Sequence, residues 1–215
     1  MHVRIKVCGI TTPEAAAAAS ELGVDAVGFV FAKSPRRVDV GEAHRLIEYL
    51  SPFVTTVAVF RHPTVDEVIS VVSSVRPNVV QTERTPVLAD AVADQAALLP
   101  VYHDGPDLVE RVAQYASRSP TPTVLLEAPG RGGRGVAPDW GRASDVARRV
   151  RLVLAGGLTP ENVEEAIRTV RPFAVDVSSG VESAPGRKDP QRIEQFVAAV
   201  RAAETQLTTG AEISR

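Results

Sequence analysis

Cys8 and Lys6 could together perform proton-transfer chemistry. They lie in the segment MHVRIKVCGI, whose apolar and β-branched residues predict a β-strand. Alternate side chains of a strand share a face, so Lys6 and Cys8 are expected to point the same way. A neighbouring ammonium group stabilises a thiolate, and we therefore expect Lys6 to lower the pKa of Cys8 toward neutrality. The alternative is that Cys8 is only a small buried apolar residue, which is common for free cysteine.

Glu127 is the second candidate for proton transfer. It closes the segment TVLLE, which is apolar up to its last residue. A carboxyl group beside apolar walls has a raised pKa and can donate a proton, whereas an exposed strand-end carboxylate would have only a structural role. A thiol base and a carboxyl acid on opposite walls would serve proton transfer on a sugar phosphate.

Two glycine-containing segments have the composition of phosphate-binding loops. AGGLTPEN and DVSSGVE each follow a predicted strand, and glycine lets the backbone N–H groups approach an anion closely. The alternative for the first segment is a tight turn without a ligand. A third segment, APGRGGRG, is either a surface loop or a cover that reaches the same phosphate. The candidate phosphate-binding residues are Gly133, Gly135, Gly156, Gly157, Ser178, Ser179 and Gly180.

The elements that would position these residues alternate regularly along the chain. Strands are predicted at 3–8, 25–30, 55–60, 78–81, 98–102, 123–127, 151–155 and 173–177. Helical patterns lie between them, and Thr12–Pro13 and Thr159–Pro160 resemble helix starts. Eight strands alternating with helices favour a closed (β/α)8 barrel. The competitor is an open doubly wound sheet, but CGITTPE lacks the glycine fingerprint expected after its first strand.

Closure of a barrel adds two expectations. The last strand would neighbour the first, so Asp176 is the expected counter-ion of Lys6, which would be costly to bury alone. Active residues of such barrels lie at the carboxyl ends of the strands. The positions selected by this rule are Cys8, 33–37, 61–62, 81–83, 103–104, Glu127, 156–157 and 176–180.

Composition narrows the class of protein. The 215 residues are 44% hydrophobic and suit one barrel domain at 1–206, followed by a polar tail at 207–215. A net charge of −2 argues against nucleic-acid binding, and no apolar run is long enough for a membrane span. One cysteine favours a reducing cytoplasm, and no His, Cys or carboxylate spacing suggests a metal site.

Several of these segments together resemble the phosphoribosylanthranilate isomerase family. The matching segments are KVCGIT, DAVGFVF with SPRRV, VAVF, VVQ, the glycine loop ending in DW, AGGLTPENV and RPFAVDVSSGVES-PG-KD. They follow the family's order from Lys6 to Asp189. The resemblance implies a single (β/α)8 TIM barrel of the ribulose-phosphate-binding type, which acts on a small phosphorylated molecule without a cofactor or metal, as a monomer or homodimer.

The implied reaction is an Amadori rearrangement in tryptophan biosynthesis. It converts N-(5-phosphoribosyl)anthranilate into 1-(2-carboxyphenylamino)-1-deoxyribulose 5-phosphate. By this resemblance Cys8 is the base that removes the proton from C2, and Glu127 is the acid that protonates the ring oxygen. Arg36 matches the arginine that holds the anthranilate carboxylate. Gln81 and Asp176 match further substrate-binding positions.

The chain departs from the family pattern at the barrel mouth. The acid is typically Asp, whereas this chain has Glu127, whose extra methylene would move the carboxyl group by about 1 Å. QTER replaces QLHG, which puts Glu83 in place of a histidine. The segment PVYHDG, at the end of the fifth predicted strand, also does not resemble the family pattern. The favoured interpretation is that the chain performs the usual reaction in a pocket that has adjusted to these changes, because Arg36 is still suited to bind an anion. The alternatives are an isomerase for a different N-ribosyl amine 5-phosphate and a non-catalytic barrel that binds a sugar phosphate.

Overall fold

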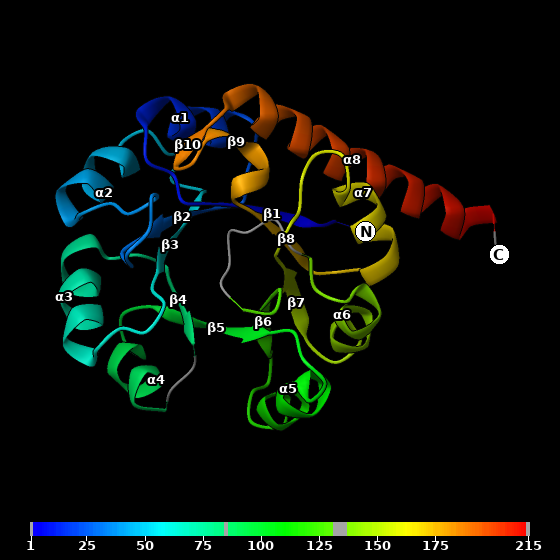
Figure 1. The fold of residues 1–215 in the computed structure, drawn as a ribbon, viewed down its shortest axis with the longest axis horizontal. Helices are drawn as coiled ribbons and strands as arrows, with labels where there is room; N and C mark the ends of the chain where they lie inside the picture. The colour runs from blue at the N-terminus through cyan, green and yellow to red at the C-terminus, as the bar shows by residue number, and fades with distance from the viewer. Residues whose placement is uncertain (1, 84–85, 131–136, 214–215) are drawn as a thin grey trace.

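The computed structural model describes residues 2–83, 86–130 and 137–213. Eight parallel strands surround the centre of the molecule and helices cover them on the outside (Figure 1). The strands are β1 (Arg4–Cys8), β2 (Ala26–Val30), β3 (Thr55–Val59), β4 (Val79–Glu83), β5 (Ala97–His103), β6 (Thr123–Glu127), β7 (Arg151–Leu154) and β8 (Ala174–Val177). The helices between them are α1 (Pro13–Glu21), α2 (Val40–Ile47), α3 (Val65–Val75), α4 (Pro86–Val92), α5 (Leu108–Ala116), α6 (Trp140–Ala147) and α7 (Val163–Val170).

The sheet is closed, as the alternation of elements predicted. β1 pairs in parallel with β2 on one side and with β8 on the other, so no open edge remains. The open doubly wound sheet is therefore excluded. In the closing pair, Lys6 lies directly opposite Asp176.

Alternate residues of β1 face different environments, as expected for a barrel strand. Val3, Ile5 and Val7 are fully buried in the layer between the sheet and the helices. Lys6 and Cys8 point into the barrel, where they are also buried. A compact apolar layer fills the interior below the mouth, made by Leu99, Leu125, Val153, Ala155 and Ala174.

Helix starts explain two of the connections after strands. The hydroxyl of Thr12 accepts a hydrogen bond from the backbone N–H of Ala15, and Pro13 is the first residue of α1, which confirms the predicted start. The predicted start at Thr159–Pro160 is wrong, because α7 begins at Val163. The side chain of Asn162 accepts from the N–H of Thr159 and donates to the carbonyl of Gly157, so these residues form a separate turn before the helix.

The chain ends in a long helix. A short 3-10 helix (Ser179–Val181) and a hairpin of β9 (Glu182–Ala184) and β10 (Arg187–Lys188) lead from β8 into α8 (Pro190–Ile213), which packs against α1 and α7. The predicted boundary between residues 206 and 207 falls inside α8, so the backbone shows no separate tail before Ile213. None of the helices in the described part of the chain combines the length and apolarity needed to span a membrane.

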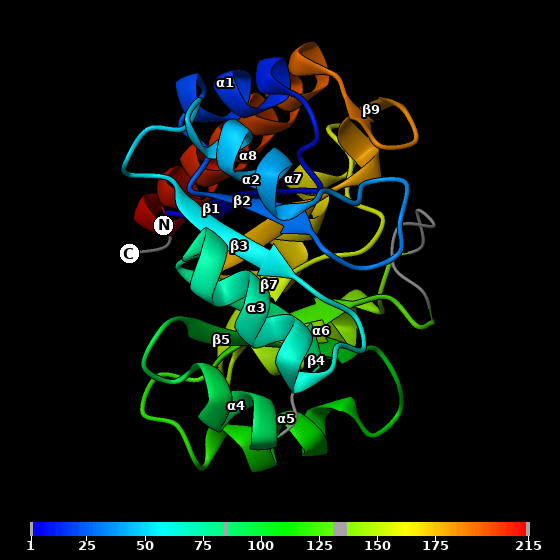
Figure 2. The same cartoon turned by 90° about the vertical axis from the view of Figure 1, so that its left-hand side faces the viewer.

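The mouth of the barrel gathers the segments that follow the strands. Figure 2 shows the arrowhead of β3, the loop after β2 and the β9 turn on the same side of the molecule. This is the end at which the carboxyl termini of parallel strands place their side chains. The candidate residues are therefore expected to meet there.

Candidate active site

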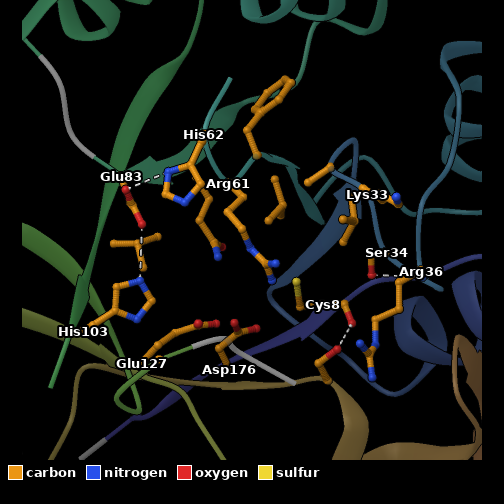
Figure 3. A pocket seen from close by; sticks show the side chains of 18 residues that line it. Cys8, Lys33, Ser34, Arg36, Arg61, His62, Glu83, His103, Glu127 and Asp176 are labelled. Carbon is orange, nitrogen blue, oxygen red and sulfur yellow. Dashed lines mark hydrogen bonds and ion pairs between the residues drawn. The ribbon is translucent and has the colours of Figure 1, made fainter. Parts of the chain in front are cut away.

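A cavity opens at the carboxyl ends of the strands (Figure 3). Six of the residues to which the sequence analysis gives a catalytic or binding role line it: Cys8, Arg36, Gln81, Glu127, Asp176 and Ser178. They come from strands or loops on several sides of the barrel, so only closure of the sheet brings them together. Gly133 and Gly135 lie outside the described residues.

The thiol of Cys8 faces the centre of this cavity. Gly28 on the neighbouring strand makes room for it, since a Cβ atom at that position would lie 2.9 Å from the Cys8 Sγ. Below the thiol, Lys6 donates to Asp176 with an Nζ–Oδ1 distance of 2.9 Å, and both side chains are about 5% exposed. The predicted inward row on β1 and the predicted counter-ion are both confirmed.

The expected low pKa of Cys8 is wrong. Burial raises the pKa of the thiol above its ordinary value, and this effect exceeds the lowering by the charge of Lys6. Asp176, which neutralises Lys6, raises the pKa of Cys8 further. For Lys6 itself, burial acts to lower the pKa, but attraction to Asp176 and Cys8 outweighs it and the pKa is raised. The lysine therefore stays charged and partly offsets the cost of forming a thiolate.

Glu127 lies at the end of β6 and points toward Asp176 and Cys8 in Figure 3. It is half-buried, and burial raises the pKa of its carboxyl group, assisted by the negative charge of Asp176. The charges of His103, Lys6 and Arg61 oppose this rise without cancelling it. A carboxyl group with a raised pKa is suited to donate a proton, as the sequence predicted.

The two predicted phosphate loops lie side by side after β7 and β8. Gly156 and Gly157 have positive φ angles of 88° and 63°, a conformation that favours glycine. A Cβ atom on Gly180 would overlap the carbonyl oxygen of Leu158, so the loops approach as closely as glycine allows. Within the described chain, the N–H groups of Gly157, Ser179 and Gly180 donate to no protein oxygen. They are therefore available to an anion.

An ion-pair cluster next to these loops was not foreseen. Glu182 accepts from Nε and Nη2 of Arg36 at 2.7 and 2.8 Å, and from Nζ of Lys188 at 2.6 Å. Lys188 also donates to the carbonyl of Ser178, whose hydroxyl donates to the carbonyl of Cys8. The cluster thus ties Arg36 to the β8 turn. The KD pair that ends the matching motif was the available sequence signal for Lys188.

A second unforeseen network lines the opposite wall. One oxygen of Glu83 lies 3.1 Å from Nδ1 of His62, and the other lies 3.4 Å from Nε2 of His103. His103 is the register partner of Glu127, so the network adjoins the candidate acid. The rule that selects strand ends had pointed to all three positions, but their mutual contacts could not be predicted from it.

The amide oxygen of Gln81 is buried and accepts no hydrogen bond from the described residues. Because the side chain lines the cavity, a ligand hydroxyl could satisfy this oxygen. In the described ranges, no three His, Cys, Asp or Glu residues are grouped closely enough to hold a metal ion.

Comparisons with known proteins agree on one family. The family model described as N-(5'-phosphoribosyl)anthranilate (PRA) isomerase matches residues 5–199. An N-(5'-phosphoribosyl)anthranilate isomerase of Trichlorobacter lovleyi is 42% identical over 202 residues, which cover 91% of this chain and 96% of that protein.

Two solved structures have the same fold. One is a phosphoribosyl anthranilate isomerase in complex with reduced 1-(o-carboxyphenylamino)-1-deoxyribulose 5-phosphate, with 38% identity and a TM-score of 0.81 over 94% of this chain and all of that one. The other contains monomers generated from the dimeric enzyme of Thermotoga maritima, with 37% identity and a TM-score of 0.81 at the same coverage.

Proposed function

The chain belongs to the N-(5′-phosphoribosyl)anthranilate isomerase family, and we propose that it converts N-(5′-phosphoribosyl)anthranilate into 1-(2-carboxyphenylamino)-1-deoxyribulose 5-phosphate in tryptophan biosynthesis. The observation that carries the proposal at the level of the site is the arrangement of Cys8 and Glu127. A thiol and a carboxyl group face one cavity, beside paired loops whose backbone N–H groups include three that donate to no oxygen of the described residues. An aldose-to-ketose rearrangement of a sugar phosphate requires a base, an acid and a site for the phosphate.

Glu127 acts first, as the general acid. Its carboxyl group donates a proton to the furanose ring oxygen while the bond from that oxygen to C1 breaks. The lone pair of the amine nitrogen forms a C1=N double bond, which gives an open-chain iminium ion. The raised pKa of Glu127, caused mainly by burial, keeps the proton available for this step.

Cys8 acts second, as the general base. Its thiolate removes the proton from C2, the electrons of that C–H bond form a C1=C2 double bond, and the iminium electrons return to nitrogen. The resulting enol tautomerises to the ketone, with a proton delivered to C1. The charge of Lys6 stabilises the thiolate, although burial raises the pKa of the thiol.

The remaining residues hold the substrate. Gly156, Gly157, Ser178, Ser179 and Gly180 form the phosphate site at the β7 and β8 turns, with Lys188 supplying positive charge beside them. Gln81, Asp176 and Arg36 contact the sugar and its substituents.

The molecule that binds the chain in this proposal is a small phosphorylated substrate. A cytoplasmic location agrees with the single, unpaired cysteine. Both a monomer and a homodimer fit the proposal.

The decisive experiment follows the loss of phosphoribosylanthranilate fluorescence with purified protein. We expect turnover by the wild type and a loss of about 10²- to 10⁴-fold in kcat for Cys8→Ser and Glu127→Gln, with unchanged circular dichroism. Wild-type protein that binds phosphate but does not turn over would instead indicate a non-catalytic barrel. Turnover of a different N-ribosyl amine alone would indicate a changed substrate.

A further inference from the structure

Arg61 is a cavity-lining cation that the proposed mechanism leaves unused. It follows β3, lines the cavity and points toward the centre, where Cys8, Glu127 and Asp176 gather (Figure 3). Within residues 2–83, 86–130 and 137–213, its guanidinium has no hydrogen bond or ion pair with a protein acceptor. A guanidinium group in this state can receive a ligand anion with both oxygens engaged.

Three of the acidic side chains around the cavity already have partners. Asp176 pairs with Lys6, and Glu182 pairs with Arg36 and Lys188. Glu83, at the end of the neighbouring strand β4, has one histidine at each oxygen. Among the described residues, Glu127 is then the acid on which the charge of Arg61 acts, and the proposed mechanism uses Glu127 in its protonated, uncharged form.

Arg36 is engaged elsewhere. Its Nε and Nη2 atoms both donate to Glu182, which offsets its charge and holds it beside the β8 turn. The N–H groups on Nη1 and the second hydrogen of Nη2 can still reach a ligand, but the charge of Arg36 is already offset by Glu182 and Arg36 is held beside the β8 turn. A second cation that is not offset in this way would add to the attraction for a carboxylate at some distance from the phosphate loops.

The closed barrel places Arg61 on the side of the mouth opposite the phosphate loops, where the carboxylate of the substrate would lie. In the order of eight strands, β3 lies opposite β7, so a substrate anchored by phosphate at the β7 and β8 turns extends across the mouth toward β3. The carboxylate of the anthranilate half is only a few bonds from C1. A group that holds it must lie near the proton-transfer residues, and the charge of Arg61 does act on Glu127. The apolar side chains of Val59 and Val101 line the same wall and suit an aromatic ring.

We propose that Arg61 binds the carboxylate of the substrate's aromatic amine and so determines specificity for an anthranilate over an uncharged aniline. This inference rests on the proposed function, because it names a contact made by that substrate. It assigns the recognition of the carboxylate to the loop after β3, in addition to the loop that carries Arg36. It also explains why Glu83 is tolerated at the same wall.

The test measures binding and does not depend on turnover. The two ligands are reduced 1-(2-carboxyphenylamino)-1-deoxyribulose 5-phosphate and the same compound with the carboxyl group replaced by hydrogen. Isothermal titration calorimetry with wild-type protein should show a preference of about ten- to hundredfold for the carboxylated ligand, the range expected for one charge-assisted contact. In Arg61→Met the preference should fall by about fivefold or more, with any remainder due to Arg36, while the affinity for the uncharged ligand stays the same.

Lys33→Met is the matched control, because Lys33 also lines the cavity without an ion pair among the described residues. The preference should survive this change. A preference that is retained in Arg61→Met, or lost equally in Lys33→Met, would overturn the inference. Failure of the proposed function would show itself separately, as absence of turnover by the wild type.

Discussion

At the scale of single residues, the site combines two groups whose pKa values are raised for the same reason. Burial is the largest effect on both Cys8 and Glu127. The reactive form needs a proton on Glu127 and none on Cys8, so the pair must carry one proton in total. The one-proton state dominates between the two pKa values. Because a thiol ordinarily has a higher pKa than a carboxyl group, this proton lies mainly on Cys8, and the reactive arrangement is a minor, pH-independent fraction of the one-proton state.

The plot of kcat/KM against pH should therefore be bell-shaped, with both of its limbs displaced to higher pH. The acid limb should lie above the ordinary pKa of a glutamic acid, because below it the pair carries two protons. The alkaline limb should lie above the ordinary pKa of a cysteine, because above it the pair carries none. Steady-state rates across pH, together with the pH dependence of Cys8 alkylation by iodoacetamide, measure both limbs. An alkaline limb near neutrality would contradict this expectation.

Residue types and spacing predicted much of this site, but they did not predict its charge balance. The alternation of Lys6 and Cys8 on one strand placed both inside the barrel, and Asp176 followed from closure. The sign of the pKa shift on Cys8 did not follow, because it depends on how far burial exceeds a lysine that is already neutralised. The pairing of Arg36 with Glu182, and the lack of such a pair for Arg61 among the described residues, could not be predicted either, since only the fold shows which carboxylate reaches which guanidinium.

At the scale of elements, Asp104 fixes both ends of the connection between β6 and α6. Its N–H donates to the carbonyl of Glu127, and its carboxylate accepts from the N–H of Asp139 and from two nitrogens of Arg142. The hydrogen bond from Arg142 is the main reason that the pKa of Asp104 is lowered. The composition of PVYHDG gave no hint of this role, because the partners lie about 35 residues away in the sequence.

Asp104→Asn should reduce the free energy of unfolding by about 1–3 kcal/mol at neutral pH, the usual range for charged hydrogen bonds. Because the folded pKa is below the unfolded one, this contribution is present above the unfolded value and is lost as pH falls through the folded value. The difference in the free energy of unfolding between the wild type and Asp104→Asn should therefore become smaller at acid pH. Urea unfolding at several pH values measures this difference. Asp107→Asn is the control, since its pair with Arg111 is exposed and should contribute little; an equal loss in both variants would contradict the assignment.

At the scale of the whole molecule, the closing contact between β1 and β8 is also the floor of the active site. The ion pair of Lys6 and Asp176 crosses this seam, and both side chains are almost completely buried. A barrel was predictable from eight alternating strands, because each strand is local in the sequence. Closure itself brings together residues that are 170 positions apart, and it was inferred only by counting strands.

Lys6→Met tests how much the contact between β1 and β8 is stabilised by the ion pair of Lys6 and Asp176. The variant leaves Asp176 buried without its cation, and removing one partner of a buried pair costs about 3–5 kcal/mol. The double variant Lys6→Met with Asp176→Asn should recover part of that loss, since no charge then remains buried. Guanidinium chloride unfolding of the wild type, both single variants and the double variant gives the coupling energy. If Lys6→Met unfolded at the wild-type midpoint, the pair would contribute nothing to closure, and the lysine would be retained for the thiolate alone.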